Sequence, residues 1–311
     1  MKIYSTLYVS AFILLLVSCK QETNTKDISK IDSNISPGLI HTTTGDLQKA
    51  TDQFKSYLNT DRTIEITTEI NHSQNAEDAG IDLDFNKVFF IDNPRYTVPL
   101  VEENPLMAFE FPIRIGFYQV NGKKFIVARS EEYFINRYGL NNSAALRSIG
   151  TLTETFLKQS SKAEYTQVSP IDSLEANGII TLKSPKSFSE TVSSIQDMIE
   201  GNSDLKLFES TNFSEDADAI GSKFKSLHLF VFGNPKVGSE LMQKNPNFSI
   251  DLPLKILVED HSEDMVSIHF QDLSFTAKLH DEEFENELPK QITDNLKAML
   301  TKTFSLEPEN E

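Results

Sequence analysis

The sequence is short of cysteine and of positive charge. The 311-residue chain has one cysteine, Cys19, which excludes a disulfide framework and a zinc site built from cysteines. Lysine and arginine number 29 against 46 aspartates and glutamates, so the formal net charge is −17. A surface this negative repels phosphate backbones and anionic headgroups, which argues against nucleic-acid binding and against a polybasic membrane-surface module.

Several catalytic motifs are also missing. The patterns HEXXH and GXSXG do not occur. Gly233 and Gly238 resemble a phosphate loop, but Ser239-Glu240 follows where a P-loop has Lys-Ser/Thr, which rejects that interpretation. Five histidines lack the spacing of metal ligands, and we predict no metal and no cofactor. They are His41, His228, His261, His269 and His280.

The N-terminus has the pattern of a bacterial lipoprotein signal. Lys2 is followed by the apolar run Ile3–Val17, which is too short for a spanning helix, and Leu16-Val17-Ser18-Cys19 matches a lipobox. We expect residues 1–18 to be removed and Cys19 to carry the acyl chains that form a stable anchor. The alternative is an ordinary secretory signal with a chance cysteine. Lys20 favours the outer membrane, and the face of the membrane stays open.

Composition divides the rest of the chain. Residues 19–36 are polar and are expected to form a flexible tether. Two domains are expected at 37–158 and 178–303, separated by a polar linker at 159–177. Residues 304–311 form an acidic tail.

The two predicted domains are copies of one another. Phe89–Ile115 aligns with Phe230–Ile256 without a gap at an offset of 141, and eight of the 27 positions are identical. The same offset pairs Phe134 with Phe275. A shared short motif would not keep a constant offset over such a length, so duplication is the simplest explanation.

Each copy is predicted to have the order β-α-β-β-β-β-α, an α+β fold whose antiparallel sheet carries helices on one face. Asp46 is expected to start a helix with an apolar stripe, and Asn121-Gly122 to form a hairpin turn. Thr97 is expected to cap a short helix, and Ser143–Lys158 to form the closing helix of the first copy.

Each copy resembles the domain-of-unknown-function family 302. The residues that carry the resemblance are Phe232–Lys255 in the second copy and Asn93–Leu100, Asn104-Pro105 and Glu110–Arg114 in the first. The resemblance implies a TATA-binding-protein-like β-α-β(4)-α domain. It implies neither DNA binding nor any reaction, because a fold does not carry a function.

The family pattern also points to candidate ligand-binding residues. Asn93-Pro94-Arg95 and Asn234-Pro235-Lys236 either bind an anion through backbone N–H groups and a cation, or simply build turns. His72 is either a general base or ligand, or a packed histidine; the second copy has Phe213 there. Glu110/Arg114 and Asp251/Lys255 are interpreted as surface pairs at a strand entry, with a role in holding a ligand as the alternative. The full candidate set is His72, Asn93, Arg95, Asn104, Arg114, Asn234, Lys236, Asn245 and Lys255.

These observations favour a cell-envelope lipoprotein that acts as a non-catalytic tandem ligand-binding or protein-interaction module. Its expected partners are the membrane, through lipid on Cys19, and a small anionic ligand or an envelope protein. The alternatives are an enzyme or redox/stress-response component with a His72/Arg95 site, and a structural spacer.

Overall fold

The computed structural model describes residues 34–60, 63–141, 143–174, 177–261, 265–284 and 286–306. Cys19, the signal segment, most of the tether and most of the acidic tail lie outside the described residues. All described residues belong to one compact unit. Within them, no helix combines the length and apolar character needed to cross a membrane.

The first copy contains five principal strands and an added short one. The strands are β1 (Leu39–Thr43), β2 (Glu65–Asn71), β3 (Asn86–Asp92), β4 (Ile113–Val120), β5 (Lys123–Arg129) and β6 (Gln167–Val168). The helices are α1 (Leu47–Leu58), α2 (His72–Asp78), α3 (Pro94–Glu103), the 3-10 helix η2 (Pro105–Glu110), α4 (Glu131–Tyr138) and α5 (Ala144–Ser161).

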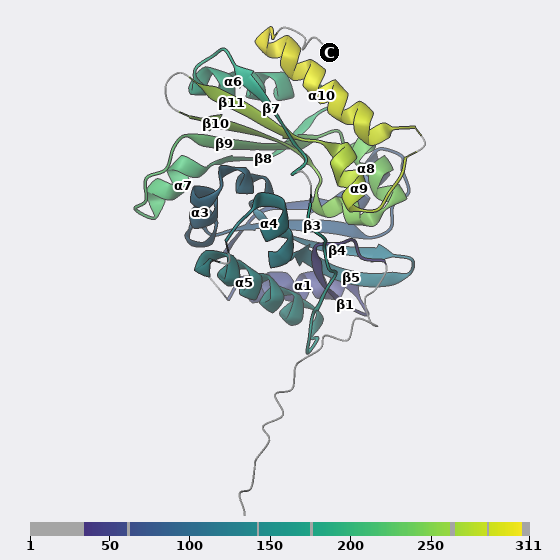
Figure 1. Cartoon of the computed structure of the whole chain (residues 1–311). Coiled ribbons are helices and arrows are strands. Elements are labelled where there is room, and N and C mark those ends of the chain that lie inside the picture. The colour runs from purple at the N-terminus through teal and green to yellow at the C-terminus, as the bar shows by residue number, and fades with distance from the viewer. Residues whose placement is uncertain are drawn as a thin grey trace, which may run out of the picture. The chain divides into compact units, whose positions relative to one another are not determined.

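The second copy repeats this order. Its strands are β7 (Ile179–Ser184), β8 (Lys206–Asn212), β9 (Leu227–Gly233), β10 (Leu254–Asp260) and β11 (Val266–Gln271). Its helices are α6 (Phe188–Glu200), α7 (Phe213–Ala219), α8 (Pro235–Lys244), the 3-10 helix η3 (Pro246–Ile250), α9 (Leu273–Leu279) and α10 (Leu288–Phe304). The predicted duplication and the α+β class are therefore confirmed (Figure 1).

Both sheets are antiparallel and have the same topology. The strand orders are β2-β3-β4-β5-β1-β6 and β8-β9-β10-β11-β7. The offset of 141 holds through β4 and β10. It becomes 142 after the hairpin, because Gly116 pairs with Val127 where Leu257 pairs with His269. The structure thus aligns Tyr133, rather than Phe134, with Phe275.

Local sequence signals explain most element ends. The Asp46 carboxylate accepts the backbone N–H of Lys49 and starts α1. Asn121 and Gly122 have φ of 49° and 77°, as a two-residue hairpin turn requires. The prediction that Thr97 caps α3 is wrong: the cap lies four residues earlier, where the Asn93 side chain accepts the N–H of Arg95. Proline at the first helical position makes this start favourable.

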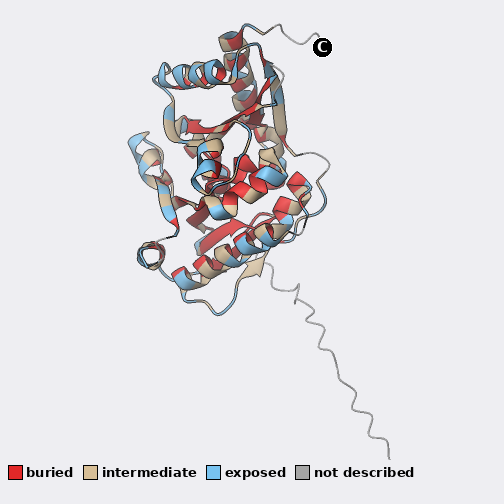
Figure 2. Ribbon diagram, turned by 90° about the vertical axis from the view of Figure 1, so that its left-hand side faces the viewer, coloured by how far each residue is buried: buried red, intermediate tan, exposed pale blue. Residues whose placement is uncertain are grey.

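One face of each sheet is covered by two long helices of the same copy. In the first copy, α1 and α5 pack together over aromatic rings from β3 and β4. Phe54 of α1 lies 5.1 Å from Phe89 and 5.6 Å from Phe156, measured between ring centroids. In the second copy, α6 and α10 cover a smaller cluster that includes Ile195, Phe230 and Leu300. Figure 2 shows these helices buried on one side and exposed on the other.

The opposite face of each sheet is covered by the other copy. η3 packs against β3 and β4, while η2 packs against β9 and β10. Likewise α2 packs against α8, and α7 against α3. These reciprocal contacts relate the copies as an isologous interface relates two subunits. The largest buried cluster draws on both copies, so the two domains share a core.

Three segments differ from the predicted organisation. Ile35, assigned to the tether, is buried in a cluster with Leu39 and Tyr118. The linker contributes β6, which pairs with β1. The short helix α4 lies between the hairpin and the closing helix, and its cap is Ser130. Ile35 and β6 depend on contacts with residues that are distant in sequence, so local pattern did not indicate them. The signals of α4 are local, a Ser130 cap and a left-handed Gly139 at its end, and the prediction from sequence missed them.

Candidate functional site

The cavity that stands out lies in the second copy, beside the turn between β9 and α8, and has a volume of about 180 Å³. Most of its lining is apolar. Its apolar side chains are Leu205, Phe208, Phe232, Pro235, Val237, Leu241, Met242, Leu252, Pro253, Leu254, Leu273, Ile292, Leu296 and Met299. The polar or glycine members are His72, Asn75, Gly233, Asn234, Gly238 and Asn295. An apolar pocket with a few polar groups is the usual form of a small-molecule site.

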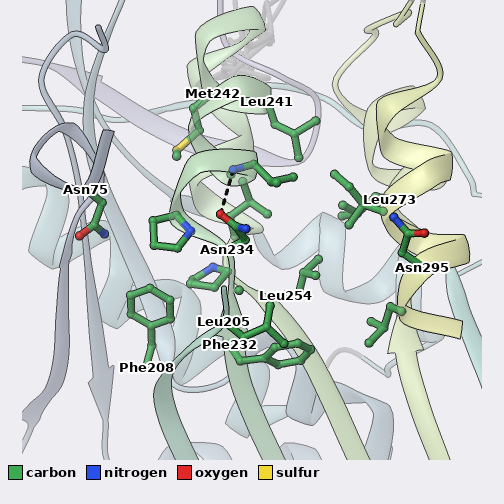
Figure 3. Close-up of a pocket in the computed structure, with 18 of the residues that line it drawn as sticks. Asn75, Leu205, Phe208, Phe232, Asn234, Leu241, Met242, Leu254, Leu273 and Asn295 are labelled. Atoms are coloured by element: carbon green, nitrogen blue, oxygen red, sulfur yellow. Dashed lines mark hydrogen bonds between the residues drawn. The ribbon is translucent and has the colours of Figure 1, made fainter. Parts of the chain in front are cut away.

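Asn234 lines this cavity at the start of α8. Its side-chain oxygen accepts the N–H of Lys236 at 2.9 Å and that of Val237 at 3.4 Å, which caps α8 at its first turn. Figure 3 draws the bond to Val237 as a dashed line. Asn234 therefore builds the turn, and its side-chain oxygen is already engaged. The Lys236 side chain is exposed and does not line the cavity. The anion-site interpretation of this turn stays a prediction.

The first copy closes one side of the cavity. His72 and Asn75 reach it from α2, which packs on α8, and Figure 3 places Asn75 across the turn from Leu273 and Asn295. Burial lowers the pKa of His72 to about 4, so its imidazole is neutral at pH 7. Its Nε2 atom is buried and has no hydrogen-bond partner. The structure thus joins His72 with Asn234 rather than with Asn93 and Arg95.

The corresponding place in the first copy has different residues. Asp92 and Thr97 stand where the second copy has Gly233 and Gly238. Both glycines line the cavity, and Thr97 is fully buried. A methyl group added at Gly238 would approach Leu252 no closer than 3.8 Å, so the helix has open space there. Small residues in the second copy therefore leave a volume that larger ones occupy in the first.

A pair of carboxyl groups marks the same place in the first copy. Burial and the neighbouring Asp216 carboxylate raise the pKa of Asp92 to about 7. Burial and nearby acidic groups also raise the pKa of Asp216. Since Asp216 belongs to α7 of the second copy, this pair, like the pairing of His72 with Asn234, forms only when the copies pack together.

A network of charged residues is buried where the copies meet. Glu110 contacts Arg114 and Arg137, and accepts hydrogen bonds from the hydroxyls of Tyr133 and Tyr138 at 3.0 and 2.6 Å. Burial alone would raise the pKa of Glu110, but the guanidinium groups outweigh it and hold the pKa below its ordinary value.

Asp251 occupies the matching position in the second copy. Its carboxylate lies 2.5 Å from Arg129 and 2.6 Å from His280. Lys255 donates to the backbone oxygens of Asp251 and Pro253. The interpretation of Glu110/Arg114 and Asp251/Lys255 as surface pairs is wrong, because all four residues are at most 3% exposed. The sequence pattern assigned them to the surface because it contains no signal that each copy is covered by the other.

The remaining candidates have structural or exposed positions. Asn104 and Asn245 cap η2 and η3 and donate to the backbone oxygens of Tyr138 and His280. Arg95 is exposed and does not line the cavity that contains His72.

Sequence reasoning missed the apolar lining, of which Phe208 and Leu205 are examples. The signal that could have indicated this cavity is that Gly233 and Gly238 are smaller than Asp92 and Thr97, the matching residues of the first copy.

The fold and site define a tandem α+β protein in which two copies of one domain pack together and share a buried core. Residues 40–155 and 180–303 both match the profile described as domain of unknown function DUF302, and the chain belongs to that family. A solved structure described as the uncharacterized conserved protein DUF302 from Bacillus stearothermophilus is similar at 14% identity and a TM-score of 0.35. The similarity covers 98% of that chain and 42% of this one.

Curated relatives include proteins of Brucella. The chain is 25% identical over 134 residues to the fluoride-specific ion channel FluC 1 of Brucella suis, and equally to FluC 1 of Brucella abortus. The match covers 43% of this chain, 50% of the first relative and 47% of the second. It therefore spans about half the length of these relatives.

Proposed function

We propose that this protein is a non-catalytic cell-envelope lipoprotein that binds a small, mainly apolar molecule in the cavity beside Asn234. The observation that carries the proposal is the apolar lining of a cavity of about 180 Å³. An engineered apolar cavity of about 150 Å³ is large enough for benzene, so a small aromatic or a short acyl group fits here.

The polar groups at the cavity supply orientation rather than chemistry. His72 is neutral and has one unpartnered ring nitrogen, which can form a single hydrogen bond with a ligand. No charged side chain is among the residues that line the cavity. These features favour an apolar ligand over a phosphate-like one, and a binding role over acid–base catalysis.

Thermal-shift titration with indole tests the cavity. We expect indole to raise the melting temperature in a dose-dependent way. Gly238→Leu should abolish the shift because the added side chain enters the cavity, whereas Gly238→Ala adds only a methyl group and should keep it. Both substitutions favour the helix over glycine, so neither should lower stability. No shift in the wild type, or an equal shift in Gly238→Leu, would refute the proposal.

The anchor requires a separate experiment. Mass spectrometry of the mature protein should find acyl chains on Cys19, and membrane fractions should contain it. Cys19→Ser should release the protein from the membrane. A mature N-terminus without fatty acid would refute the lipoprotein assignment and leave the cavity proposal standing.

A small inorganic anion is a second candidate ligand. In the described part of the chain, the ion pairs of three buried arginines, Arg114, Arg129 and Arg137, involve two carboxylates, those of Glu110 and Asp251. Each arginine has at least one buried guanidinium nitrogen without a hydrogen-bond partner. Fluoride is a rational probe, since the Brucella relatives are named fluoride-specific channels.

Fluoride and chloride titrations distinguish this candidate from the cavity. Saturable stabilisation by sodium fluoride that exceeds the effect of sodium chloride at equal ionic strength would support it. Arg114→Met should reduce that effect, and Gly238→Leu should leave it unchanged. Equal responses to the two salts would refute it.

A further inference from the structure

A cluster of side chains that can act as metal ligands lies away from the cavity, on the β10–β11 hairpin. One ligand atom from each of Glu259, His261 and His269 lies within 4.8 Å of the others. His269 Nε2 is 3.0 Å from one carboxylate oxygen of Glu259, and His261 Nδ1 is 3.5 Å from the other. The spacing along the chain gave no metal motif, because strand pairing rather than sequence distance brings the two histidines together.

The second nitrogen of each imidazole is held by a hydroxyl group. His269 Nδ1 lies 2.8 Å from Thr181 Oγ1, and His261 Nε2 lies 2.9 Å from Ser267 Oγ. Outer partners of this kind fix the ring orientation and tautomer of metal-binding histidines. Here they leave the nitrogens nearest Glu259 as the ones available to a cation.

The first copy has apolar residues at the positions of this cluster. The register places Tyr118, Val120, Phe125 and Val127 where the second copy has Glu259, His261, Ser267 and His269. Those four residues of the first copy all belong to one buried apolar cluster. The same surface of the fold is therefore a small hydrophobic core in one copy and a set of metal-ligand side chains and their hydroxyl partners in the other.

We propose that Glu259, His261 and His269 bind a divalent transition-metal ion of the zinc type. Two imidazoles and one carboxylate are a recurrent zinc ligand set that leaves a further position for water. The His261 side chain is 29% exposed, so the ion can enter from solvent. Lys225 contacts the same carboxylate oxygen of Glu259 that His261 Nδ1 faces. Its ammonium group therefore competes with a bound ion for that oxygen.

Calorimetric titration of zinc chloride into the full chain without an affinity tag tests the site. We expect one ion per chain, and at least tenfold weaker binding in Glu259→Gln and in His261→Ala. Cobalt should produce the visible absorption of a four-coordinate complex, and His261→Ala should remove it. Lys225→Met should bind zinc several-fold more tightly, because the competing ammonium group is gone.

His228→Gln is the matched control. This histidine lies on β9 of the same sheet, and its Nε2 bonds to Ser210 outside the cluster. Its substitution should leave zinc affinity unchanged. Absent or substoichiometric binding, wild-type affinity in His261→Ala at an unchanged melting temperature, or affinity in Lys225→Met no greater than the wild type's would overturn the proposal.

Discussion

The guanidinium group of Arg129 in the first copy lies 2.5 Å from the carboxylate of Asp251 in the second, and both side chains are at most 3% exposed. Burial alone would raise the pKa of Asp251, but Arg129 and His280 outweigh it and hold the pKa well below its ordinary value. The contact is therefore an ion pair that joins the two copies in a medium where an unpaired charge is costly.

Removing one member of this pair should destabilise the protein strongly. Asp251→Asn leaves Arg129 buried without its counter-charge and should lower the free energy of unfolding by about 3–5 kcal/mol. The double variant Arg129→Met/Asp251→Asn should lose less than the sum of the single losses, as urea denaturation can measure. Asp294→Asn removes a pair exposed by about 60% on each side and should cost under about 1 kcal/mol. Additive losses at Arg129 and Asp251 would contradict the assignment.

The shared core predicts that the two copies unfold together. Phe213, Leu229 and Leu257 of the second copy lie in the same buried cluster as Phe54 and Phe89 of the first. Separation of the copies would expose this surface, so we expect one calorimetric transition for the whole chain. Far-ultraviolet circular dichroism and tyrosine fluorescence should report the same midpoint in urea. Two separate transitions would show that the interface contributes little.

Because the His72 imidazole is buried, we expect the protein to lose stability in mild acid. Burial lowers its folded-state pKa from 6.5 to about 4, so protonation favours the unfolded chain. Its contribution is fully present above pH 6.5 and is lost as the pH falls toward 4, with an upper size on the order of 3 kcal/mol. His72→Phe introduces the residue that the second copy has at the matching position, Phe213. This variant should show a smaller decrease in unfolding free energy between pH 6.5 and 4 than the wild type; an identical decrease would refute the role of burial.

For the buried Asp92 carboxyl group we expect the opposite dependence of stability on pH. Burial and Asp216 raise its pKa from 3.8 to about 7, so the protonated form is the one that the folded state favours. Its contribution is fully present below pH 3.8 and is lost as the pH rises through 7. Asp92→Asn keeps the shape without the charge. Relative to the wild type, it should be more stable at pH 8 than at pH 5, in chemical denaturation at both values. A constant difference would contradict the raised pKa.

Much of the fold could be predicted from the sequence because its signals are local. The apolar stripe behind Asp46, the Asn121-Gly122 turn and the repeat at an offset of 141 each specify structure within one copy. The start of α3 was misplaced because Asn93 and Thr97 are both acceptable caps, and only Pro94 at the first helical position distinguishes them.

The candidate site was predicted less well, for a physical reason. The sequence identified His72 and Asn234 as separate candidates but did not indicate that they line the same cavity. It placed Glu110 and Asp251 at the surface, where charged residues usually lie. Asp251 pairs with Arg129 of the other copy, and η2, which contains Glu110, packs against β9 and β10 of the second copy. No local pattern encodes these contacts between copies.

The sequence by itself determined the duplication and the β-α-β(4)-α order of each copy. It also showed that the catalytic motifs HEXXH and GXSXG do not occur. Only the tertiary structure decided which faces are buried, which residues from different copies meet, and where the second copy keeps an open cavity. The reason is that hydrogen-bonded turns and periodic apolar stripes act over a few residues, whereas desolvation and charge pairing depend on whatever the folded chain brings alongside.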